Sequence, residues 1–360
     1  MNFSEIWEKF SSYKALEGID KPMPVQDAAI PPILDGRDLL IQSPTGTGKT
    51  LAYLLPIFAG IKPEIKGAQG VVIAPTYELA AQIAQVAKGL AERPEDVALL
   101  IGGAAKKRQE AALKLKPRLI VGSLGRIVDF IMDKKISMHH VRTIVFDEAD
   151  RLFTAQNLDN IKFFVTSALK SRQILLVSAT LPQKTRELAA PLMKEPLSIS
   201  TGGKVPQNIR HFYVICDGRK KTERLRGLIH SQKIAKSLVF VNMPYAIEKT
   251  AARLNFHKIP AKSLHAGGDK VARKAAMDAL RHGKIKVLVS SDAGSRGLDI
   301  RDLTHVINLD MPAREKDYLH RAGRCGRAGS PGVVISIITP GEAETLKKFA
   351  KKLGIEIGKL

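Results

Sequence analysis

Ser43-Pro44-Thr45-Gly46-Thr47-Gly48-Lys49-Thr50 is the stretch of sequence that decides the fold. A short apolar run of buried-strand type precedes it at residues 38–42, and a run that begins a helix follows at residues 51–55. A strand, a glycine-rich turn, a lysine-threonine pair and a helix, in this order, are typical of a phosphate-binding loop. A chance match in a surface turn would lack the flanking strand and helix, so we favour the phosphate-binding loop.

Two glycines explain how this loop would bind a phosphate. Gly46 and Gly48 let the backbone wrap closely, so that successive N–H groups point at one anion. The N-terminus of the following helix adds its partial positive charge. We expect Lys49 to reach the β- and γ-phosphates of a nucleotide and the Thr50 hydroxyl to hold Mg²⁺. The usual pattern begins with glycine six residues before the lysine, whereas this chain has Ser43 there.

Composition narrows the class of protein. A length of 360 residues favours two or three domains, and a hydrophobic content of 44% is enough for ordinary cores. The sequence has no apolar run of transmembrane length and no signal-peptide pattern at its start. Two scattered cysteines, Cys216 and Cys325, are too few for a disulfide framework or a cysteine-ligated zinc site. We therefore expect a cytoplasmic protein without a membrane partner.

The formal net charge of +22 points to a polyanionic partner. A chain this basic attracts RNA, DNA or anionic lipid. A lysine-rich solvated surface is the commoner meaning of basic composition taken alone. Together with a nucleotide loop, the charge favours a nucleic-acid partner.

Apolar runs of strand length recur along the chain and alternate with helical stretches, which favours parallel sheets covered on both faces. After the phosphate loop they are Val71–Ala74, Leu99–Ile101, Leu119–Val121, Ile144–Phe146, Ile174–Val177, Phe212–Ile215, Leu238–Val241, Val287–Val289, Val306–Leu309 and Val333–Ile337. Helical patterns cover Glu78–Leu90 and Gln109–Lys116. Near the N-terminus, Pro22, Pro24, Pro31 and Pro32 are expected to break the helical pattern.

The alternation of apolar strands and helices begins again after a stretch rich in glycine, proline and polar residues, a composition typical of linkers. We therefore predict an α/β fold of two doubly wound parallel-sheet domains, at residues 1–203 and 210–360, joined by a linker at 204–209. Only the first domain carries a phosphate-binding loop.

An acidic cluster follows the strand Ile144–Phe146. Ligands of doubly wound sheets sit beyond the carboxyl ends of the strands. Asp147 at such a strand end, beside a phosphate loop, is placed to hold Mg²⁺, and Glu148 is placed to orient and deprotonate the attacking water. Acidic residues that cap a following helix are the simpler alternative, and it is strongest for Asp150.

The residues 147–150, Asp-Glu-Ala-Asp, carry the signature of the DEAD-box RNA helicases, and the chain resembles that family over nearly its whole length. Further segments resemble the family's motifs in the same order: Gly18–Gln26, Pro75–Ala80, Gly102-Gly103, Val121–Arg126, Ser178-Ala179-Thr180, Ser291–Asp299 and Tyr318–Arg327. The resemblance implies two tandem RecA-like domains that bind ATP and RNA and hydrolyse ATP.

The resemblance also implies which residues contact the nucleotide. Gln26 would bond the adenine edge, because a carboxamide offers a donor and an acceptor together. Arg324 and Arg327 would reach the γ-phosphate and act with Lys49, Asp147 and Glu148 as the catalytic set. The remaining nucleotide contacts implied are Ile19, Ser43, Thr45, Gly46, Thr47, Gly48, Thr50, Gly297 and Asp299.

RNA contacts and coupling residues are implied in the same way. The RNA contacts would be Thr76, Gly103, Ser123, Arg126, Arg273 and Ser291. Small donors and arginines suit a grip on the sugar–phosphate backbone without base reading. Residues that couple the domains would be Ser178, Thr180, His320 and Arg321.

The chain departs from the family's pattern at three places. Ile19 stands where an aromatic residue usually faces the adenine, Tyr77 replaces an arginine, and Ser123-Leu124 replaces a threonine-proline pair. These changes are expected to affect ATP and RNA affinity.

We expect a monomeric, ATP- and Mg²⁺-dependent RNA helicase that closes an interdomain cleft on ATP and RNA and locally separates a duplex. Structured RNA, with ribosomal precursor particles as one setting, is the expected partner. An ATP-gated RNA clamp or assembly scaffold is an alternative from another class, and a processive DNA helicase is a second alternative.

Overall fold

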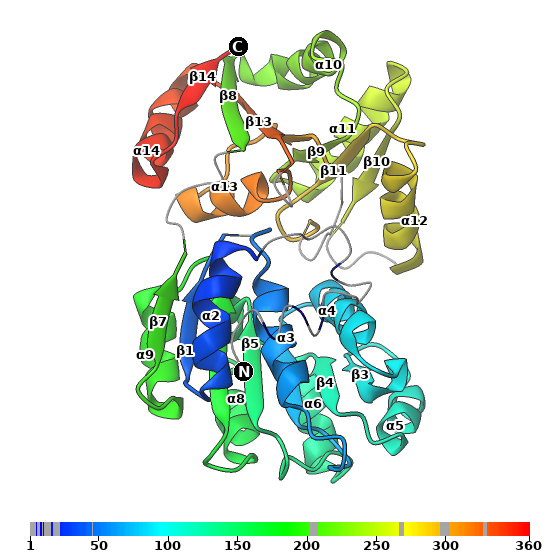
Figure 1. Cartoon of the computed structure of the whole chain (residues 1–360). Coiled ribbons are helices and arrows are strands. Elements are labelled where there is room, and N and C mark those ends of the chain that lie inside the picture. The colour runs from blue at the N-terminus through cyan, green and yellow to red at the C-terminus, as the bar shows by residue number, and fades with distance from the viewer. Residues whose placement is uncertain are drawn as a thin grey trace. The chain divides into compact units, whose positions relative to one another are not determined.

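The computed structural model describes residues 22–44, 46–201, 208–265, 270–295, 303–326 and 330–360, together with residues 5, 8, 10 and 16 (Figure 1). Apart from residues 44–46, the chain divides into two compact units, one ending at Thr201 and the other beginning at Gly202. The structure leaves most of the predicted linker at 204–209 outside the described residues. Its last residue, Ile209, begins a strand of the second unit.

The first unit contains a seven-stranded parallel sheet within the residues described. Its spatial order is β3-β4-β2-β5-β6-β1-β7. The strands are β1 (Leu39–Gln42), β2 (Gly70–Ile73), β3 (Val97–Leu100), β4 (Leu119–Gly122), β5 (Thr143–Asp147), β6 (Gln173–Ser178) and β7 (Leu197–Ser200). The helices are α2 (Pro24–Leu34), α3 (Lys49–Gly60), α4 (Tyr77–Leu90), α5 (Lys106–Lys114), α6 (Leu124–Met132), α7 (Ala149–Leu152), α8 (Leu158–Thr166) and α9 (Gln183–Ala189).

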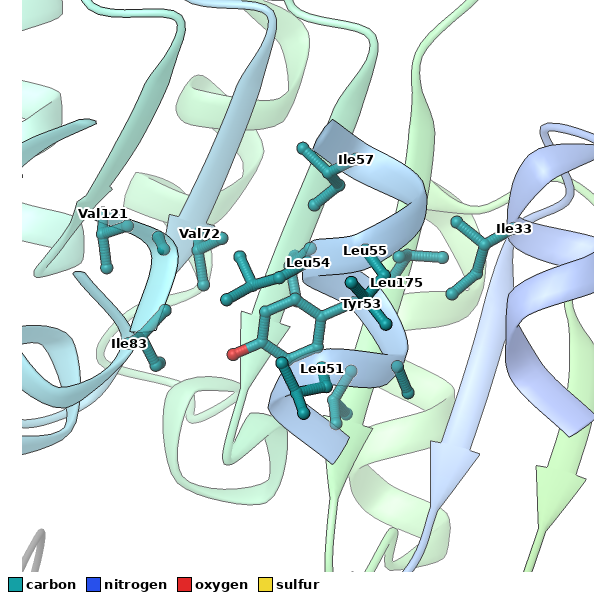
Figure 2. Packing of buried hydrophobic residues seen from close by; sticks show 14 of the residues in the cluster. Ile33, Leu51, Tyr53, Leu54, Leu55, Ile57, Val72, Ile83, Val121 and Leu175 are labelled. Atoms are coloured by element: carbon teal, nitrogen blue, oxygen red, sulfur yellow. The ribbon is translucent and has the colours of Figure 1, made fainter. Parts of the chain in front are cut away.

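Successive residues of the central strands enter different cores, as the alternation of side chains along a strand requires. Val72 packs under α3 and α4, whereas Val71 and Ile73 belong to the core on the other face of the sheet. Figure 2 shows Leu51, Leu54 and Leu55 of α3 directed into the first of these cores, near Val72 and Leu175. Both faces of the sheet are therefore covered, and its carboxyl edge is left for the loops.

The second unit repeats this design with a parallel sheet ordered β10-β11-β9-β12-β13-β8-β14. Its strands are β8 (Ile209–Ile215), β9 (Ser237–Phe240), β10 (Ala261–Leu264), β11 (Val287–Ser290), β12 (His305–Asn308), β13 (Gly332–Ile338) and β14 (Ile357–Lys359). Its helices are α10 (Lys221–Ser231), α11 (Pro244–Phe256), α12 (Lys270–Arg281), α13 (Glu315–Ala322) and α14 (Ala343–Leu353). The predicted fold class is confirmed: two doubly wound α/β units, each with a parallel sheet.

The strands that the sequence did not indicate are β7, β10 and β14. All three lie at sheet edges. Their sequences, Leu-Ser-Ile-Ser, Ala-Lys-Ser-Leu and Ile-Gly-Lys, are short and lack the continuous apolar run of a strand buried on both faces. Hydrogen bonds to a neighbouring strand, rather than hydrophobic pattern, define them.

The prediction that prolines break the N-terminal helical pattern was wrong for Pro31 and Pro32, which lie inside α2. A proline inside a helix leaves the carbonyl four residues earlier without its usual donor. Those carbonyls belong to Asp27 and Ala28, which are exposed to solvent. Water can therefore satisfy them, so two prolines on the exposed side of the helix are tolerated. Pro24 occupies the first turn, where proline has no donor to lose.

Candidate nucleotide and RNA sites

The phosphate loop joins the carboxyl end of β1 to the N-terminus of α3, as the sequence predicts. Gly46 and Gly48 have φ values of 86° and 83°, in the left-handed region that favours glycine. A Cβ added at Gly48 would lie 2.5 Å from Nε2 of Gln26, so a side chain there would displace the Gln26 carboxamide. Thr45 lies outside the described residues.

Hydrogen bonds of the Lys49 and Ser43 side chains stabilise the phosphate loop. The Lys49 ammonium donates to the Ser43 carbonyl over 2.7 Å. The buried Ser43 hydroxyl lies 2.6 Å from the Thr47 hydroxyl and accepts from the Thr201 hydroxyl over 3.0 Å. The serine that departs from the usual glycine therefore adds hydrogen bonds that a glycine cannot make.

Gln26 lies against the phosphate loop and is almost fully buried. Its Oε1 accepts from the Met23 N–H over 2.8 Å, and its Nε2 donates to the Gly48 carbonyl over 3.3 Å. Both ends of the carboxamide are thus anchored to backbone groups, and the 3.3 Å contact ties the predicted adenine contact to the loop. Ile19, the other adenine contact predicted in this region, lies outside the described residues.

Asp147 ends β5 and is buried, with 4% of its surface exposed. The Tyr53 hydroxyl donates to Oδ2 over 2.9 Å, and the Glu148 N–H donates to Oδ1 over 2.8 Å. Burial raises the Asp147 pKa to about 6, although the Lys49 charge and the hydrogen bond from Tyr53 oppose this. Tyr53 follows Thr50 by three residues on α3, so the two side chains lie on the same face of that helix. Tyr53 thus ties the helix that carries Thr50 to the strand end that carries Asp147.

These residues fit a magnesium ion. Among the described residues, no three His, Cys, Asp or Glu side chains form a group that could hold a metal ion. Mg²⁺ typically takes one or two carboxylates and keeps several waters, so one carboxylate and one hydroxyl suffice. Tyr53 was missed by the sequence reasoning. Its place three residues after Thr50, on the same helix face, was the available signal.

Glu148 is held in a left-handed backbone conformation, with φ of 50°, at the start of α7. This conformation is uncommon for a residue with a side chain, and such residues cluster at functional sites. The Glu148 carboxylate accepts from the Arg151 guanidinium over 2.6 Å. The turn separates its side chain from the buried Asp147 and leaves it partly exposed.

Asp150 links the ends of β5 and β6. It accepts from the Ser178 hydroxyl over 2.6 Å and from the Thr180 hydroxyl over 3.2 Å. The alternative that Asp150 caps the following helix was wrong, because Asp150 lies inside α7 and Glu148 occupies the N-cap position. Ser178 and Thr180, predicted to couple the domains, are joined here to the acidic cluster of the first unit.

The predicted RNA contacts of the first unit lie at the same carboxyl edge, after β2, β3 and β4. The Thr76 hydroxyl caps α4 by accepting from the Leu79 N–H, and Gly103 has a φ of 71°. Ser123 precedes α6, and Arg126 donates to the Ala104 carbonyl over 3.4 Å. The structure thus brings these four residues to one edge, where they are partly or fully exposed.

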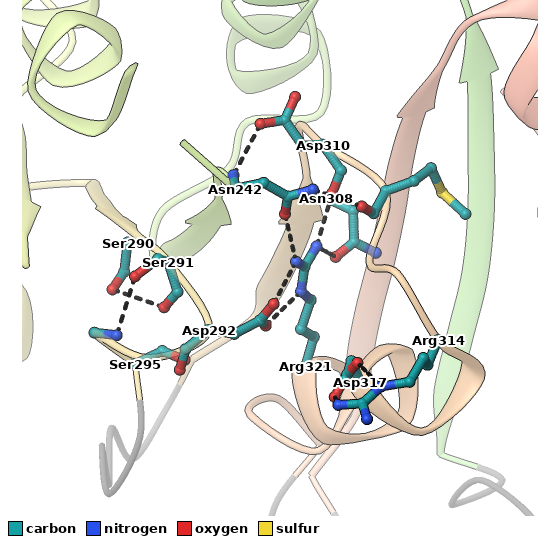
Figure 3. Close-up of polar contacts among 12 residues, drawn as sticks. Asn242, Ser290, Ser291, Asp292, Ser295, Asn308, Asp310, Arg314, Asp317 and Arg321 are labelled. Carbon is teal, nitrogen blue, oxygen red and sulfur yellow. Dashed lines mark hydrogen bonds and ion pairs between the residues drawn. The ribbon is translucent and has the colours of Figure 1, made fainter. Parts of the chain in front are cut away.

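In the second unit, Arg321 is 1% exposed and donates all five of its N–H groups (Figure 3). Two go to the Asp292 carboxylate, both over 2.7 Å. The other three go to the Asn308 and Asn242 side chains and to the Asp310 carbonyl. The guanidinium also lies over the Phe240 ring, 4.8 Å from its centroid. All the donors of Arg321 are therefore used within its own unit, and none is left for a ligand.

The other predicted site residues of the second unit lie on or just after β11, α12 and α13. Ser291 follows β11 and accepts from the Gly294 N–H over 3.1 Å. His320 lies on α13, Arg324 is buried just after it, and Arg273 is half-buried on α12. Gly297, Asp299 and Arg327 lie outside the described residues.

Two RecA-like units, one with a phosphate loop facing an acidic strand end, define a two-domain nucleotide-dependent enzyme of the helicase class. Family models agree: the DEAD/DEAH box helicase model matches residues 23–188, and the helicase conserved C-terminal domain matches residues 220–329. The chain belongs to the DEAD-box family of ATP-dependent RNA helicases.

Relatives support this assignment over the whole length. The chain is 43% identical to the DEAD-box ATP-dependent RNA helicase CshC of Bacillus cereus, covering 98% of this chain and 89% of the relative. It is 41% identical to the probable ATP-dependent RNA helicase YfmL of Bacillus subtilis, covering 94% and 91%.

Solved structures show the same fold. S. cerevisiae Dbp5 bound to RNA and ADP BeF3 matches with a TM-score of 0.86 and 26% identity, covering all of this chain and 94% of that one. Mss116p bound to ssRNA and AMP-PNP matches with a TM-score of 0.85 and 25% identity, covering all of this chain and 80% of that one.

The family assignment confirms the predicted enzyme, an RNA helicase that hydrolyses ATP, and does not favour the clamp alternative. Among the described helices, none has both the length and the apolar character needed to cross a bilayer.

Proposed function

We propose that ATP binds at the phosphate loop with its phosphates held by Lys49 and the loop N–H groups. Gln26, Ile19, Gly297 and Asp299 contact the base and ribose, as the family resemblance implies. The observation that carries the proposal is the convergence of Lys49, Thr50 and Asp147 on the carboxyl edge of one sheet, where the Tyr53 hydroxyl of α3 donates to Asp147.

Asp147 and Thr50 would hold Mg²⁺, which when bound neutralises charge on the β- and γ-phosphates. Glu148 then orients the attacking water and accepts its proton at a carboxylate oxygen. To do so, the carboxylate leaves the 2.6 Å contact with Arg151. Arg324 and Arg327 stabilise the charge that develops on the γ-phosphate, an effect of about 10³ to 10⁵ in rate for arginine fingers.

We assign RNA binding to the backbone, through Thr76, Gly103, Ser123 and Arg126 of the first unit and Arg273 and Ser291 of the second. Their placement at strand ends, with small donors and arginines rather than stacked aromatics, supports contacts to sugar and phosphate. Ser178, Thr180 and His320 would couple the nucleotide to RNA binding. Arg321, whose donors are all used inside the second unit, would position α13 instead of making a contact itself.

Glu148→Gln tests the chemical assignment. We expect turnover to fall by at least about 100-fold, the lower range for loss of a general base, with ATP affinity within about two-fold of wild type. Steady-state ATPase assays with saturating RNA and equilibrium binding of a labelled nucleotide measure both. Glu64→Gln, an exposed carboxylate-to-amide change in the same unit, is the matched control. Undiminished turnover in Glu148→Gln would refute the assignment of the base.

The natural setting we propose is a monomeric enzyme in the bacterial cytoplasm that remodels structured RNA during ribosome assembly. The similarity to bacterial helicases of comparable length supports it. RNA crosslinked to the protein in growing cells should be enriched in ribosomal precursor sequences. Enrichment of unrelated transcripts alone would indicate that the enzyme acts in another pathway. ATPase stimulation by RNA but not by matched DNA would exclude the DNA-helicase alternative.

A further inference from the structure

The charge of the molecule is concentrated in the second unit. Residues 202–360 contain 31 Lys and Arg against 14 Asp and Glu, a net charge of +17, whereas residues 1–201 contain 26 against 21, a net charge of +5. The motifs that the family uses occur in both units, so they do not account for this difference. One place in the second unit carries several cations and no neighbouring carboxylate in the same loops.

That place is the edge of the second sheet where the strands begin, opposite to the edge that carries the motifs. The strands of the sheet are parallel, so the loops that lead into β9, β10 and β11 meet there. The loops at residues 232–236, 257–260 and 282–286 contain no aspartate or glutamate. We call their cations, together with the last residue of the preceding helix, the basic edge: Lys233, Lys236, Lys258, Arg281, Lys284 and Lys286.

Backbone contacts join these loops into one continuous surface. The Lys236 ammonium donates to the Arg281 carbonyl over 3.1 Å, and the Ser237 N–H donates to the Lys286 carbonyl over 2.9 Å. The Lys286 N–H donates to the Pro260 carbonyl over 2.8 Å. Adjacent strands lie about 4.8 Å apart, so the cations of three neighbouring strands form a row about 10 Å long.

Four of the six cations of the basic edge are exposed lysines. Lys233, Lys258, Lys284 and Lys286 are exposed, and none of them has a carboxylate within 4.0 Å among the described residues. Arg281 lies 3.7 Å from Asp278. At the corresponding edge of the first unit, the cations around β3 and β4 lie next to carboxylates: Arg93 pairs with Asp96 over 2.8 Å, and Arg118 lies 3.8 Å from Glu92 and Asp96.

An aromatic side chain stands at the same edge. Phe256 ends α11 and is 82% exposed. Its ring meets the His257 ring edge to face at 5.1 Å, and the Arg226 guanidinium lies 3.0 Å from a nitrogen of that histidine. Exposed aromatics beside cations are how proteins hold unpaired bases next to a phosphate backbone.

We propose that the basic edge is a second RNA-binding surface, which holds the phosphates of an RNA segment flanking the one engaged by the motifs, with an unpaired base stacked on Phe256. The proposal rests on the RNA helicase activity of the family and adds a substrate feature to it. An RNA with a long single-stranded extension would be preferred to a short one, because only the longer RNA reaches both edges of the unit.

The test removes four charges without touching the motif edge. The variant carries Lys233→Gln, Lys258→Gln, Lys284→Gln and Lys286→Gln. The matched control carries Lys62→Gln, Lys66→Gln, Lys162→Gln and Lys170→Gln, which removes four exposed charges from the first unit. Each protein is titrated with a single-stranded RNA of about 10 nucleotides, near the span of one binding site, and with the same RNA extended to about 40.

We expect the variant to lose at least ten-fold in affinity for the extended RNA at about 0.1 M salt and to keep its affinity for the short RNA. The slope of log affinity against log salt for the extended RNA should decrease by up to about 3, since each single-strand phosphate contact contributes about 0.7. RNA-stimulated ATP turnover with the short RNA should be unchanged. The control variant should match wild type.

Three outcomes would overturn the proposal: no loss with the extended RNA, an equal loss in the control variant, or an equal loss with the short RNA. Failure of the short RNA to stimulate the wild-type ATPase would be a different result, because it would question the helicase assignment and not this surface.

Phe256→Ala gives an independent readout. It should weaken binding of a single-stranded extension by about five-fold or more, the lower range for loss of one stacked base, and leave a fully paired extension unaffected. Phe256→Trp should restore the affinity. An equal effect on paired and unpaired extensions would remove the stacking part of the proposal.

Discussion

Burial of the ionised Asp147 carboxylate lowers the stability of the first unit. Its ordinary pKa of 3.8 rises to about 6 because the carboxylate is buried. A carboxyl whose pKa is raised by folding stabilises the folded state at low pH and loses this contribution as the pH rises from 3.8 through 6. At neutral pH the buried charge therefore destabilises the first unit by roughly 3 kcal/mol. The ionised form of Asp147 is nevertheless required, because only the carboxylate can bind a cation.

Asp147→Asn should remove that cost. The amide can still lie between Tyr53 and the Glu148 backbone, because a tyrosine hydroxyl both donates and accepts. We expect the variant to be more stable than wild type by up to about 3 kcal/mol at pH 7.5, with the difference vanishing below pH 4. Chemical denaturation at the two pH values measures it. ATP with Mg²⁺ should stabilise wild type and have little effect on the variant. A destabilised variant at pH 7.5 would show that its hydrogen bonds outweigh the burial of charge.

Buried polar contacts hold helix α13 in position. Arg321 ties it to Asp292 and Asn308, and Asn308 in turn donates to the Ser336 hydroxyl over 3.1 Å. One turn away, the hydroxyl of the fully buried Tyr318 lies 3.0 Å from Nδ1 of His211. These contacts fix the helix that carries His320 and is followed by Arg324.

Tyr318→Phe should therefore loosen α13 while keeping its apolar packing. Loss of a buried hydroxyl that pairs with His211 should cost about 1 to 3 kcal/mol, because the buried imidazole nitrogen is left without its partner. If the contacts position Arg324, kcat should fall by several-fold while KM for ATP changes little. A merely structural role would lower the folded fraction and leave the kcat of the folded enzyme unchanged. Hydrogen exchange over residues 315–326 separates the two, and Tyr213→Phe, a partly exposed tyrosine of the same unit, is the control.

At the scale of the molecule, Asp147 of the first unit and His211 of the second contribute opposite pH dependences to stability. Burial lowers the His211 pKa from 6.5 to about 4, so this histidine stays neutral in the folded second unit. The unfolded chain binds its proton near pH 6.5 and the folded chain only near pH 4. The second unit thus loses up to about 3 kcal/mol of stability as the pH falls through this window. Over part of the same range, acidification relieves the burial of Asp147 in the first unit.

Calorimetry from pH 7.5 to pH 4.5 should therefore show two unfolding transitions that respond differently to acid. Each unit has its own pair of cores, which favours separate transitions. His211→Leu should reduce the acid sensitivity of the second unit only, and Asp147→Asn should raise the transition of the first unit at pH 7.5 only. A single transition shifted by both variants would show that the units unfold as one.

The sequence determined by itself those features that are encoded locally. The phosphate loop, the acidic strand end and the central strands of both sheets follow from short patterns: glycines at fixed spacing, and apolar runs that are buried on both faces. The edge strands β7, β10 and β14 did not follow, because one neighbouring strand and not a hydrophobic pattern defines them. Nor did the helical state of Pro31 and Pro32, which depends on exposed carbonyls in the turn before them.

Tertiary structure alone decided the partners of the polar residues. Tyr53 reaches Asp147, Asp150 reaches Ser178, and Arg321 reaches Asp292 across 94, 28 and 29 residues of sequence. No spacing rule predicts such pairs, because the parallel sheet brings distant strand ends to one edge. The same geometry collected the cations of three separate loops into the basic edge. Burial then set the pKa values of Asp147 and His211, since desolvation depends on everything that packs around a group.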